Sequence, residues 1–190
     1  MFKHAVVEPG TVPSIPVPDV LLFGLPDTPV RGAAYGLLDG MLRDLDAGSV
    51  ADLVKDDLGR PFSPRNLDLF VSLAHTDGAV AAAISTEGRI GIDVEATTHY
   101  DPDIGNLVLT SAQRALIEAS ANPDAHFLRL WTRKEAIGKA LGVGIEDDVL
   151  RCPAENDRVL LRGHSLCIHD LSAPVGCYAA IAFERKTRDD

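Results

Sequence analysis

Two carboxylates, Asp93 and Glu95, lie two residues apart in the stretch GRIGIDVE, residues 88–95. Isoleucine and valine alternate with other residues there, which predicts a β-strand with one apolar face and both carboxylates on the opposite face. The two carboxylates would lie about 6–7 Å apart along the strand. Charges 4 Å apart repel by roughly 4 kcal/mol at an effective dielectric of 20, unless the side chains diverge or a cation lies between them. The spacing therefore favours a divalent-cation site, and the alternative is a solvated acidic face on an edge strand.

A third carboxylate, Glu135, lies in the stretch DAHFLRLWTRKEAIGKALG, residues 124–142. Apolar residues recur there at helical spacing, and Gly142 is a natural helix end. Glu135 and Lys139 are four residues apart, so they share one side of the predicted helix, at the edge of its apolar stripe. Such a helix could present a carboxylate and an ammonium group to a neighbouring strand. The alternative is an ordinary surface pair, worth about 0.3 kcal/mol.

Further elements must position these two segments. Residues 31–46 have apolar side chains at helical spacing and predict a helix, although three glycines weaken it. Thr110 and Gln113 have the spacing of a capping box, which predicts the start of a helix that ends near Asn122. Half of the twelve prolines fall within the first 29 residues, so that segment should be extended and irregular, or contain at most short edge strands.

Strands are predicted before and after the helix expected over residues 124–142. Residues 79–85 and 89–95 flank Thr-Glu-Gly, which predicts a β-hairpin leading into the acidic pair. Residues 159–171 and 176–184 predict two more strands. The pattern as a whole indicates an α+β chain in which helices pack against antiparallel strands.

The composition is that of an ordinary globular protein. A chain of 190 residues with 46% hydrophobic and 24% charged residues is long enough to bury a core in one or two domains. Three cysteines without C-x-x-C spacing argue against a disulfide framework and against a zinc site. Prolines interrupt every early apolar run, so the sequence indicates neither a signal peptide nor a membrane span, and a cytoplasmic location is expected.

Taken together and in this order, the two segments resemble the signatures of the 4'-phosphopantetheinyl transferases. GIDVE, residues 91–95, is similar to G-[IV]-D-[IV]-E, and WTRKEAIGK, residues 131–139, is similar to W-[ST]-x-K-E-A-x-x-K. Upstream, GRP at residues 59–61 is similar to the family's G-[KR]-P, and LAHTDGAVAAAIS resembles its S-H-S segment, with His75 at the histidine. The resemblance covers roughly residues 58–145.

The resemblance implies a reaction and a set of roles. These enzymes move the phosphopantetheine arm of coenzyme A onto a serine of an acyl or peptidyl carrier protein and release adenosine 3',5'-bisphosphate. Magnesium would be held by carboxylates, a lysine would meet a phosphate oxygen, and a glutamate would take the serine proton. The residues implied are Asp93, Glu95 and Glu135 for Mg²⁺, Glu135 and Lys139 for catalysis, and Arg60, His75 and Lys139 for binding coenzyme A. Polyketide, nonribosomal peptide and fatty acid synthases all remain open as sources of the carrier.

About ninety residues precede the first signature, as in the long, surfactin-type class of this family. That resemblance implies a phosphopantetheinyl transferase-like fold of two similar α+β halves, here residues 1–88 and 89–190, with the site in the cleft between them. A monomer is expected, because paired halves would already complete the cleft. No nucleic acid and no membrane is expected as a partner.

Three features depart from the family's pattern. Ala74 stands where a serine often precedes the histidine, and Arg31 and Arg43 are the only near candidates for the basic cluster that contacts the 3'-phosphate. The net charge of −10 would repel an acidic carrier protein at long range. Arg129 and Arg133, four residues apart, could form a small basic stripe, with a solvated helix face as the alternative.

A coenzyme A or carrier-protein binding module without catalysis is the rival function, and an unrelated α+β protein with chance matches is the third reading.

Overall fold

The computed structural model describes residues 3–7, 20–24 and 30–184. The strands are β1 Lys3–Val7, β2 Val20–Gly24, β3 Val54–Lys55, β4 Pro61–Phe62, β5 Phe70–Thr76, β6 Ala79–Ser85, β7 Ile90–Ala96, β8 Arg158–Leu161, β9 His164–Leu171 and β10 Cys177–Glu184. The helices are α1 Val30–Asp44, the short 3-10 helix η1 Val50–Asp52, α2 Pro102–Val108, α3 Ser111–Glu118, α4 Pro123–Leu141 and α5 Asp147–Arg151. In the proline-rich start the structure describes only β1, at the edge of a sheet, and β2, which is paired on both sides. The prediction of edge strands at most is therefore wrong for β2, and the rest of this segment lies outside the described residues.

The first sheet has the strand order β1-β2-β6-β5, and helix α1 covers one of its faces. Its strands pair antiparallel, except that β1 and β2 run parallel. The predicted helix over residues 31–46 is confirmed as α1, whose Leu38 and Leu42 are fully buried against Val80 and Ile84 of β6 in one apolar cluster. This packing offsets the low helix propensity of the glycines in α1.

The second sheet has the order β7-β10-β9-β8, is antiparallel throughout, and is covered by the signature helix α4. Helix α4 begins after Asn122, whose side chain accepts a hydrogen bond from the Ala125 backbone N–H, and Pro123 fits its first turn. It ends at Gly142, which has a left-handed backbone with φ +71°. The predicted boundaries of the signature helix are therefore confirmed to within one residue.

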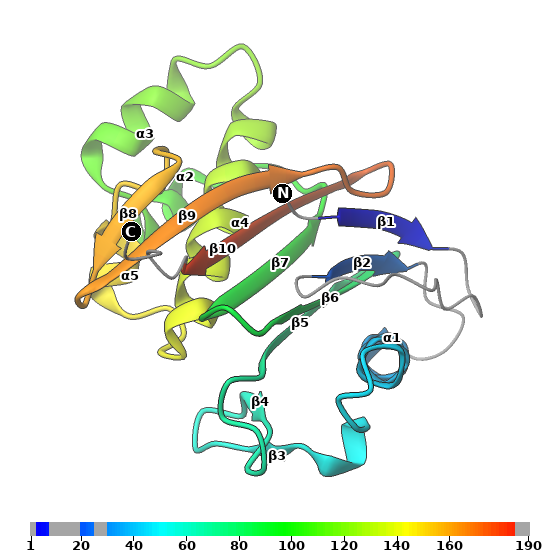
Figure 1. The fold of residues 1–190 in the computed structure, drawn as a ribbon. Helices are drawn as coiled ribbons and strands as arrows, with labels where there is room; N and C mark the ends of the chain where they lie inside the picture. The colour runs from blue at the N-terminus through cyan, green and yellow to red at the C-terminus, as the bar shows by residue number, and fades with distance from the viewer. Residues whose placement is uncertain (1–2, 8–19, 25–29, 185–190) are drawn as a thin grey trace.

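The two sheets repeat one topology. The elements β2, α1, β5 and β6 give the strand order β2-β6-β5, and the elements β7, α4, β9 and β10 give the order β7-β10-β9. In both units a strand is followed by the covering helix and then by a hairpin, whose second strand pairs with the first strand. Figure 1 shows α1 and α4 on different sides of the paired sheets. Because the two helices have unrelated sequences, the repeat was not visible in the amino-acid pattern.

The sheets meet through alanine-rich faces and along two neighbouring strands. Ile90, Ile92 and Val94 of β7 pack in one buried cluster with alanines of β5 and β6. Strand β7 is an edge strand, and two of its free N–H groups are satisfied from β5: Ile92 donates to Ser72 Oγ at 3.1 Å, and Ala96 donates to Thr76 Oγ1 at 3.0 Å. Strands β5 and β7 therefore lie side by side where the two units join.

Two strand predictions were wrong. The predicted hairpin of residues 79–85 and 89–95 does not form, because β6 is paired on both sides by β2 and β5, whereas β7 pairs with β10 in the other sheet. The predicted single strand 159–171 is broken at Arg162 and Gly163, which both have positive φ, and gives the hairpin β8–β9. The predicted strand over residues 176–184 is confirmed as β10.

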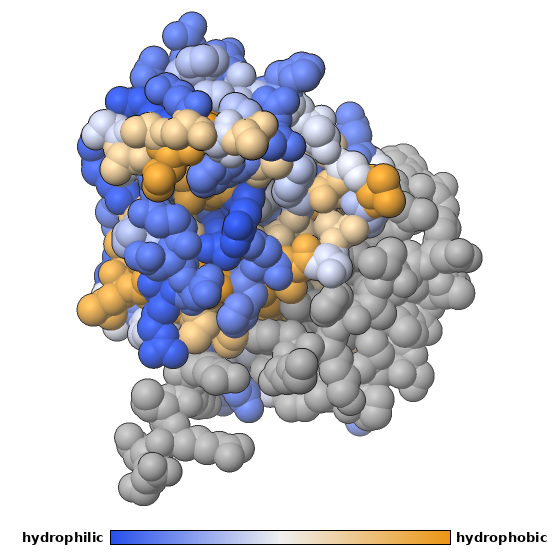
Figure 2. Space-filling view, turned by 90° about the horizontal axis from the view of Figure 1, so that it is seen from above, coloured by the Kyte–Doolittle hydropathy of each residue, from blue (hydrophilic) through white to orange (hydrophobic). Residues whose placement is uncertain are grey.

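The capping box at the start of α3 is confirmed. Thr110 Oγ1 accepts from the Gln113 backbone N–H at 3.2 Å, and Gln113 Oε1 accepts from the Thr110 N–H at 3.1 Å. Helices α2 and α3 leave three large apolar side chains exposed, and Figure 2 shows that hydrophobic residues on the face seen from above lie in small patches among hydrophilic ones. The exposed side chains on these helices are Ile104, Leu107 and Leu116. Among the described residues, no helix combines the length and the hydropathy that crossing a membrane requires.

Candidate active site

Gly91 allows α4 to pack directly on β7. A Cβ atom at this position would lie 2.0 Å from the backbone oxygen of Ala136 and 2.4 Å from the backbone nitrogen of Ala140. Both distances are far shorter than any real contact, so only glycine permits this approach of strand and helix. The close approach places the carboxylates of β7 beside Glu135 and Lys139 of α4.

Asp93 and Lys139 form an ion pair at this contact. Lys139 Nζ donates to Asp93 Oδ1 at 2.7 Å, and Asp93 is only 4% exposed. Asp93 Oδ2 is buried and has no hydrogen-bond partner. Burial raises the pKa of Asp93, and the Lys139 ammonium opposes this rise. The face of β7 that carries Asp93 is therefore covered by α4, and the alternative of a solvated acidic face is wrong for this residue.

Glu95 and Glu135 complete a group of interacting carboxylates. Burial, and then the charge of Asp93, raise the pKa of Glu95, whereas a hydrogen bond from Trp131 lowers it. Burial raises the pKa of Glu135 to about 6, with further contributions from Asp93 and Glu95 and opposition from Lys139. Burial and the charges of neighbouring carboxylates thus act in the same direction on both glutamates.

The three carboxylates fit a hard divalent cation in chemistry, although they are not assembled as a metal site. No group of three or more histidine, cysteine, aspartate or glutamate side chains in the described parts of the chain is arranged to hold a metal ion. The ammonium of Lys139 instead lies against Asp93. The unpartnered Asp93 Oδ2 and the raised pKa values of the two glutamates indicate oxygen ligands that a cation would stabilise.

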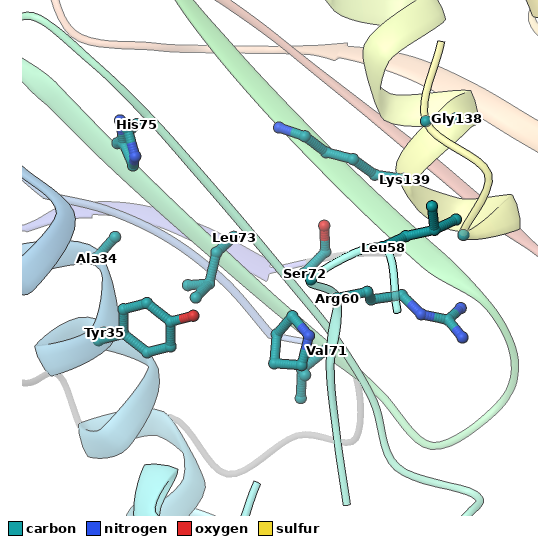
Figure 3. A pocket seen from close by; sticks show the side chains of 14 residues that line it. Ala34, Tyr35, Leu58, Arg60, Val71, Ser72, Leu73, His75, Gly138 and Lys139 are labelled. Atoms are coloured by element: carbon teal, nitrogen blue, oxygen red, sulfur yellow. The ribbon is translucent and has the colours of Figure 1, made fainter. Parts of the chain in front are cut away.

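A pocket of about 380 Å³ lies beside this carboxylate group, between the two topological units (Figure 3). Helix α1, strand β5 and the turn before β4 line it from the first unit, and the end of α4 with the loop after it lines it from the second. All three residues predicted to bind coenzyme A lie in its wall, namely Arg60, His75 and Lys139. The other lining residues are Ala34, Tyr35, Leu58, Gly59, Pro61, Val71, Ser72, Leu73, Gly138, Gly142 and Gly144.

The basic side chains are spread along the pocket. In Figure 3, His75 and Tyr35 lie on one side of the view, Arg60 lies on the other, and Lys139 extends between them from α4. Neither Tyr35 nor Ser72 was predicted to be a site residue. Ser72 is the single serine of β5 and lies three residues before His75, a signal that could have identified it.

Several predicted residues lie elsewhere. Three of them, Asp93, Glu95 and Glu135, do not line the pocket. Lys139 does line it, and its ion pair with Asp93 connects the pocket to this carboxylate group. Arg43 also does not line it and instead pairs with Asp39 at 2.7 Å on the outer side of α1. The side chain of Arg31 lies outside the described part of the structure.

The basic stripe considered for α4 does not form. Arg133 is only 3% exposed, and its Nε and Nη2 donate to the Asp170 carboxylate of β9 at 2.5 and 3.1 Å. Arg129 pairs with the same carboxylate. The basic stripe and the solvated helix face are therefore both wrong for Arg133, because β9 brings a carboxylate against this side of the helix.

Lys134, which precedes Glu135 in the signature, is fully buried. Its Nζ donates to the Val108 carbonyl at 2.9 Å, to Gln113 Oε1 at 2.8 Å and to the Leu150 carbonyl. Burial lowers its pKa to about 8. The side chain ties the ends of α2 and α5 to α4, so this lysine holds the signature helix in place and stays away from the pocket.

The chain is similar to the 4'-phosphopantetheinyl transferase AcpT of Salmonella typhi, with 29% identity over 147 residues, which cover 75% of each chain. It is 28% identical to AcpT of Escherichia coli strain K12 over 153 residues, 75% of this chain and 74% of that one. The family profile of the 4'-phosphopantetheinyl transferase superfamily matches residues 89–170, which contain both signature segments.

Both signature segments of the chain therefore match the 4'-phosphopantetheinyl transferase superfamily. A further relative, the 4'-phosphopantetheinyl transferase gsp of Aneurinibacillus migulanus, is 30% identical over 93 residues, 48% of this chain and 38% of that protein. The α+β fold, with antiparallel sheets and packed helices, agrees with this superfamily, and the enzyme type is that of a 4'-phosphopantetheinyl transferase.

Proposed function

We propose that the chain transfers the 4'-phosphopantetheine arm of coenzyme A to a serine of an acyl or peptidyl carrier protein. The observation that carries this proposal is the Asp93–Lys139 ion pair, which joins the two signature segments at the wall of a pocket lined by Arg60 and His75. The names of the relatives support the same reaction.

The chain's own residues would position the phosphates and move one proton. The serine hydroxyl attacks the phosphorus that carries the pantetheine, and adenosine 3',5'-bisphosphate leaves with the electrons of the broken P–O bond. Glu135, one helical turn before Lys139 on α4, accepts the proton of the serine hydroxyl. Lys139 binds a phosphate oxygen of coenzyme A, His75 contacts a phosphate, and Arg60 lies beside the nucleotide.

Asp93, Glu95 and Glu135 would hold Mg²⁺ in this proposal. The ion would supply neutralisation of charge on the pyrophosphate. The unpartnered oxygen of Asp93 supports the assignment, because a buried carboxylate without a second partner is costly unless a ligand completes it.

The repeated topology supports the long class. We propose that residues 1–88 and 89–190 are the two halves, and that the chain acts as a monomer because both walls of the pocket come from one chain. Sedimentation of the active protein as a trimer would contradict this assignment.

The deciding experiment is the mass of a carrier protein. The chain is incubated with coenzyme A, Mg²⁺ and each of several apo carriers, and intact carriers are weighed. A gain of one phosphopantetheine supports transfer, and the Ser→Ala variant of the carrier is the matched control. Binding of coenzyme A or carrier without any gain would favour the rival, a binding module of the same fold.

A further inference from the structure

Asp56 builds the tight turn that brings Arg60 to the pocket. Its Oδ1 accepts hydrogen bonds from the backbone N–H groups of Leu58 at 3.1 Å and Arg60 at 2.9 Å, and its Oδ2 accepts from Arg60 Nε at 3.0 Å. The backbone closes the same turn, because Asp56 N–H donates to the Arg60 carbonyl and Gly59, at φ +80°, donates to the Asp56 carbonyl. One carboxylate thus fixes both the path of the chain and the direction of the guanidinium.

The guanidinium of Arg60 lies against Gly142, where α4 ends. A Cβ atom on Gly142 would be 2.5 Å from Arg60 Nη1 and 2.7 Å from Cζ. Arg60 and Gly142 both line the pocket, and Gly142 follows Lys139 by about one helical turn. The absence of a side chain at Gly142 therefore provides the space in which the guanidinium lies.

This pair differs from the other Asp–Arg pairs four residues apart. The pairs Asp39–Arg43 and Asp147–Arg151 lie on helices outside the pocket. Asp56 uses both carboxylate oxygens inside a turn and engages Arg60 only through Nε. Within the described residues, the two Nη groups of Arg60 have no hydrogen-bond partner, so they remain able to donate to an anion.

We propose that Asp56 and Gly142 are positioning residues, which hold the Arg60 guanidinium in advance for an anionic group of coenzyme A. The inference rests on the proposed function, which makes coenzyme A the co-substrate. A guanidinium that is already oriented loses less conformational freedom when the anion binds, so affinity rises without a change in the chemical step.

The first test is Asp56→Asn. Asparagine keeps an oxygen for the backbone N–H groups of the turn but loses the charge that holds Arg60 Nε. The Kd for coenzyme A, measured by calorimetry, should rise about tenfold, the value of one charge-assisted contact, with a similar rise in KM. The kcat and the melting temperature should stay near those of the wild type. Asp147→Asn, which breaks a pair of the same spacing away from the pocket, should change none of these.

The second test is Gly142→Ala against Gly163→Ala. Both glycines have positive φ, of +71° and +81°, so both variants strain the backbone, but a Cβ on Gly163 meets nothing within 4 Å. The melting temperatures of the two variants should therefore fall by similar amounts. The atoms that Gly142→Ala displaces belong to the end of the Arg60 side chain, which can move aside at little cost in stability. Only Gly142→Ala should weaken coenzyme A binding, and it should add no further weakening in an Arg60→Ala background.

The outcomes separate this inference from the proposed function. Unchanged coenzyme A affinity in both Asp56→Asn and Gly142→Ala would overturn the positioning role while transfer by the wild type stands. A wild type that binds coenzyme A but loads no carrier would reject the proposed function, and the affinities of the variants would still decide the positioning role. A wild type that does not bind coenzyme A would overturn both.

Discussion

Lys139 of α4 donates a 2.7 Å hydrogen bond to Asp93 of β7, 46 residues earlier in the chain. This contact joins the two segments whose carboxylates the sequence indicated separately. Asp93 is buried, and one of its oxygens has no partner. An arrangement that leaves a buried carboxylate half satisfied costs stability, so a carboxylate at position 93 is better explained by a function than by folding.

The first prediction concerns Asp93→Ala. Removing this carboxylate takes away a proposed Mg²⁺ ligand but leaves the apolar face of β7 intact, and Lys139, whose side chain is 29% exposed, can turn to solvent. Transfer should fall by about 10² or more, while the melting temperature should stay equal or rise. Added Mg²⁺ should raise the melting temperature of the wild type and not that of the variant. Turnover near that of the wild type at limiting Mg²⁺ would contradict the metal assignment.

Asp170→Ala is the matched control for that experiment. Asp170 also pairs a strand with a basic side chain of α4, but its partner Arg133 is buried and would keep only Asp157, at 3.4 Å, as a charged partner. This variant should lose about 3 kcal/mol of stability and keep its transfer activity at low temperature. Loss of transfer in both variants alike would mean that loosening α4, rather than losing a ligand, explains the first result.

The second prediction separates Glu135 from Lys139. Glu135→Gln keeps the shape of the side chain but weakens a metal ligand and removes the proposed base, so kcat should fall by about 10² or more. Lys139→Met removes a positive charge from the phosphates before and during the reaction, so it should raise KM for coenzyme A and also lower kcat. Steady-state kinetics give both constants, and melting curves control for folding. Unchanged kinetics in both variants would make this an ordinary ion-pairing surface of the helix.

The third prediction uses the raised pKa of Glu135, from an ordinary value of 4.5 to about 6. Because the folded-state pKa is the higher one, folding favours the protonated form. This contribution to stability is fully present below pH 4.5 and is lost as the pH rises through 6. In metal-free buffer, Glu135→Gln should therefore gain stability relative to the wild type between pH 4.5 and 7, by on the order of 1–2 kcal/mol. Urea unfolding at several pH values measures the difference, and a difference independent of pH would place Glu135 in water.

Helix limits could be predicted from the sequence, because they depend on residues close together in the chain. Helical spacing and the end at Gly142 gave the limits of α4, and the capping box gave the start of α3, because caps and periodicity depend on residues within a few positions. The order of the signatures likewise indicated that Asp93 and Lys139 belong to one site.

Pairing between distant segments could not be read in the same way. The chain after β6 enters a different sheet, and nothing between residues 85 and 90 specifies that β7 pairs with β10 instead. Arg133 was read as a surface residue from its four-residue spacing to Arg129, yet Asp170, supplied by β9, pairs with it in the interior. Asp56 was overlooked because its role depends on a turn, which positions Arg60 against Gly142.

The last prediction concerns Gly91, the first residue of GIDVE. Gly91→Ala would place a methyl group 2.0 Å from the Ala136 carbonyl oxygen, and backbone atoms of a helix cannot move aside as a flexible side chain can. The helix must shift from β7, which should cost about 3 kcal/mol and separate Glu135 and Lys139 from Asp93.

Transfer by the Gly91→Ala protein that remains folded should therefore also fall. Gly36→Ala is the control, since Gly36 lies within α1 with nothing within 4 Å of the added methyl, and it should gain about 0.5–1 kcal/mol. Denaturant unfolding measures both changes, and transfer is assayed where each variant is fully folded. If Gly91→Ala were as stable and active as Gly36→Ala, the close packing of α4 on β7 would not be what assembles the site.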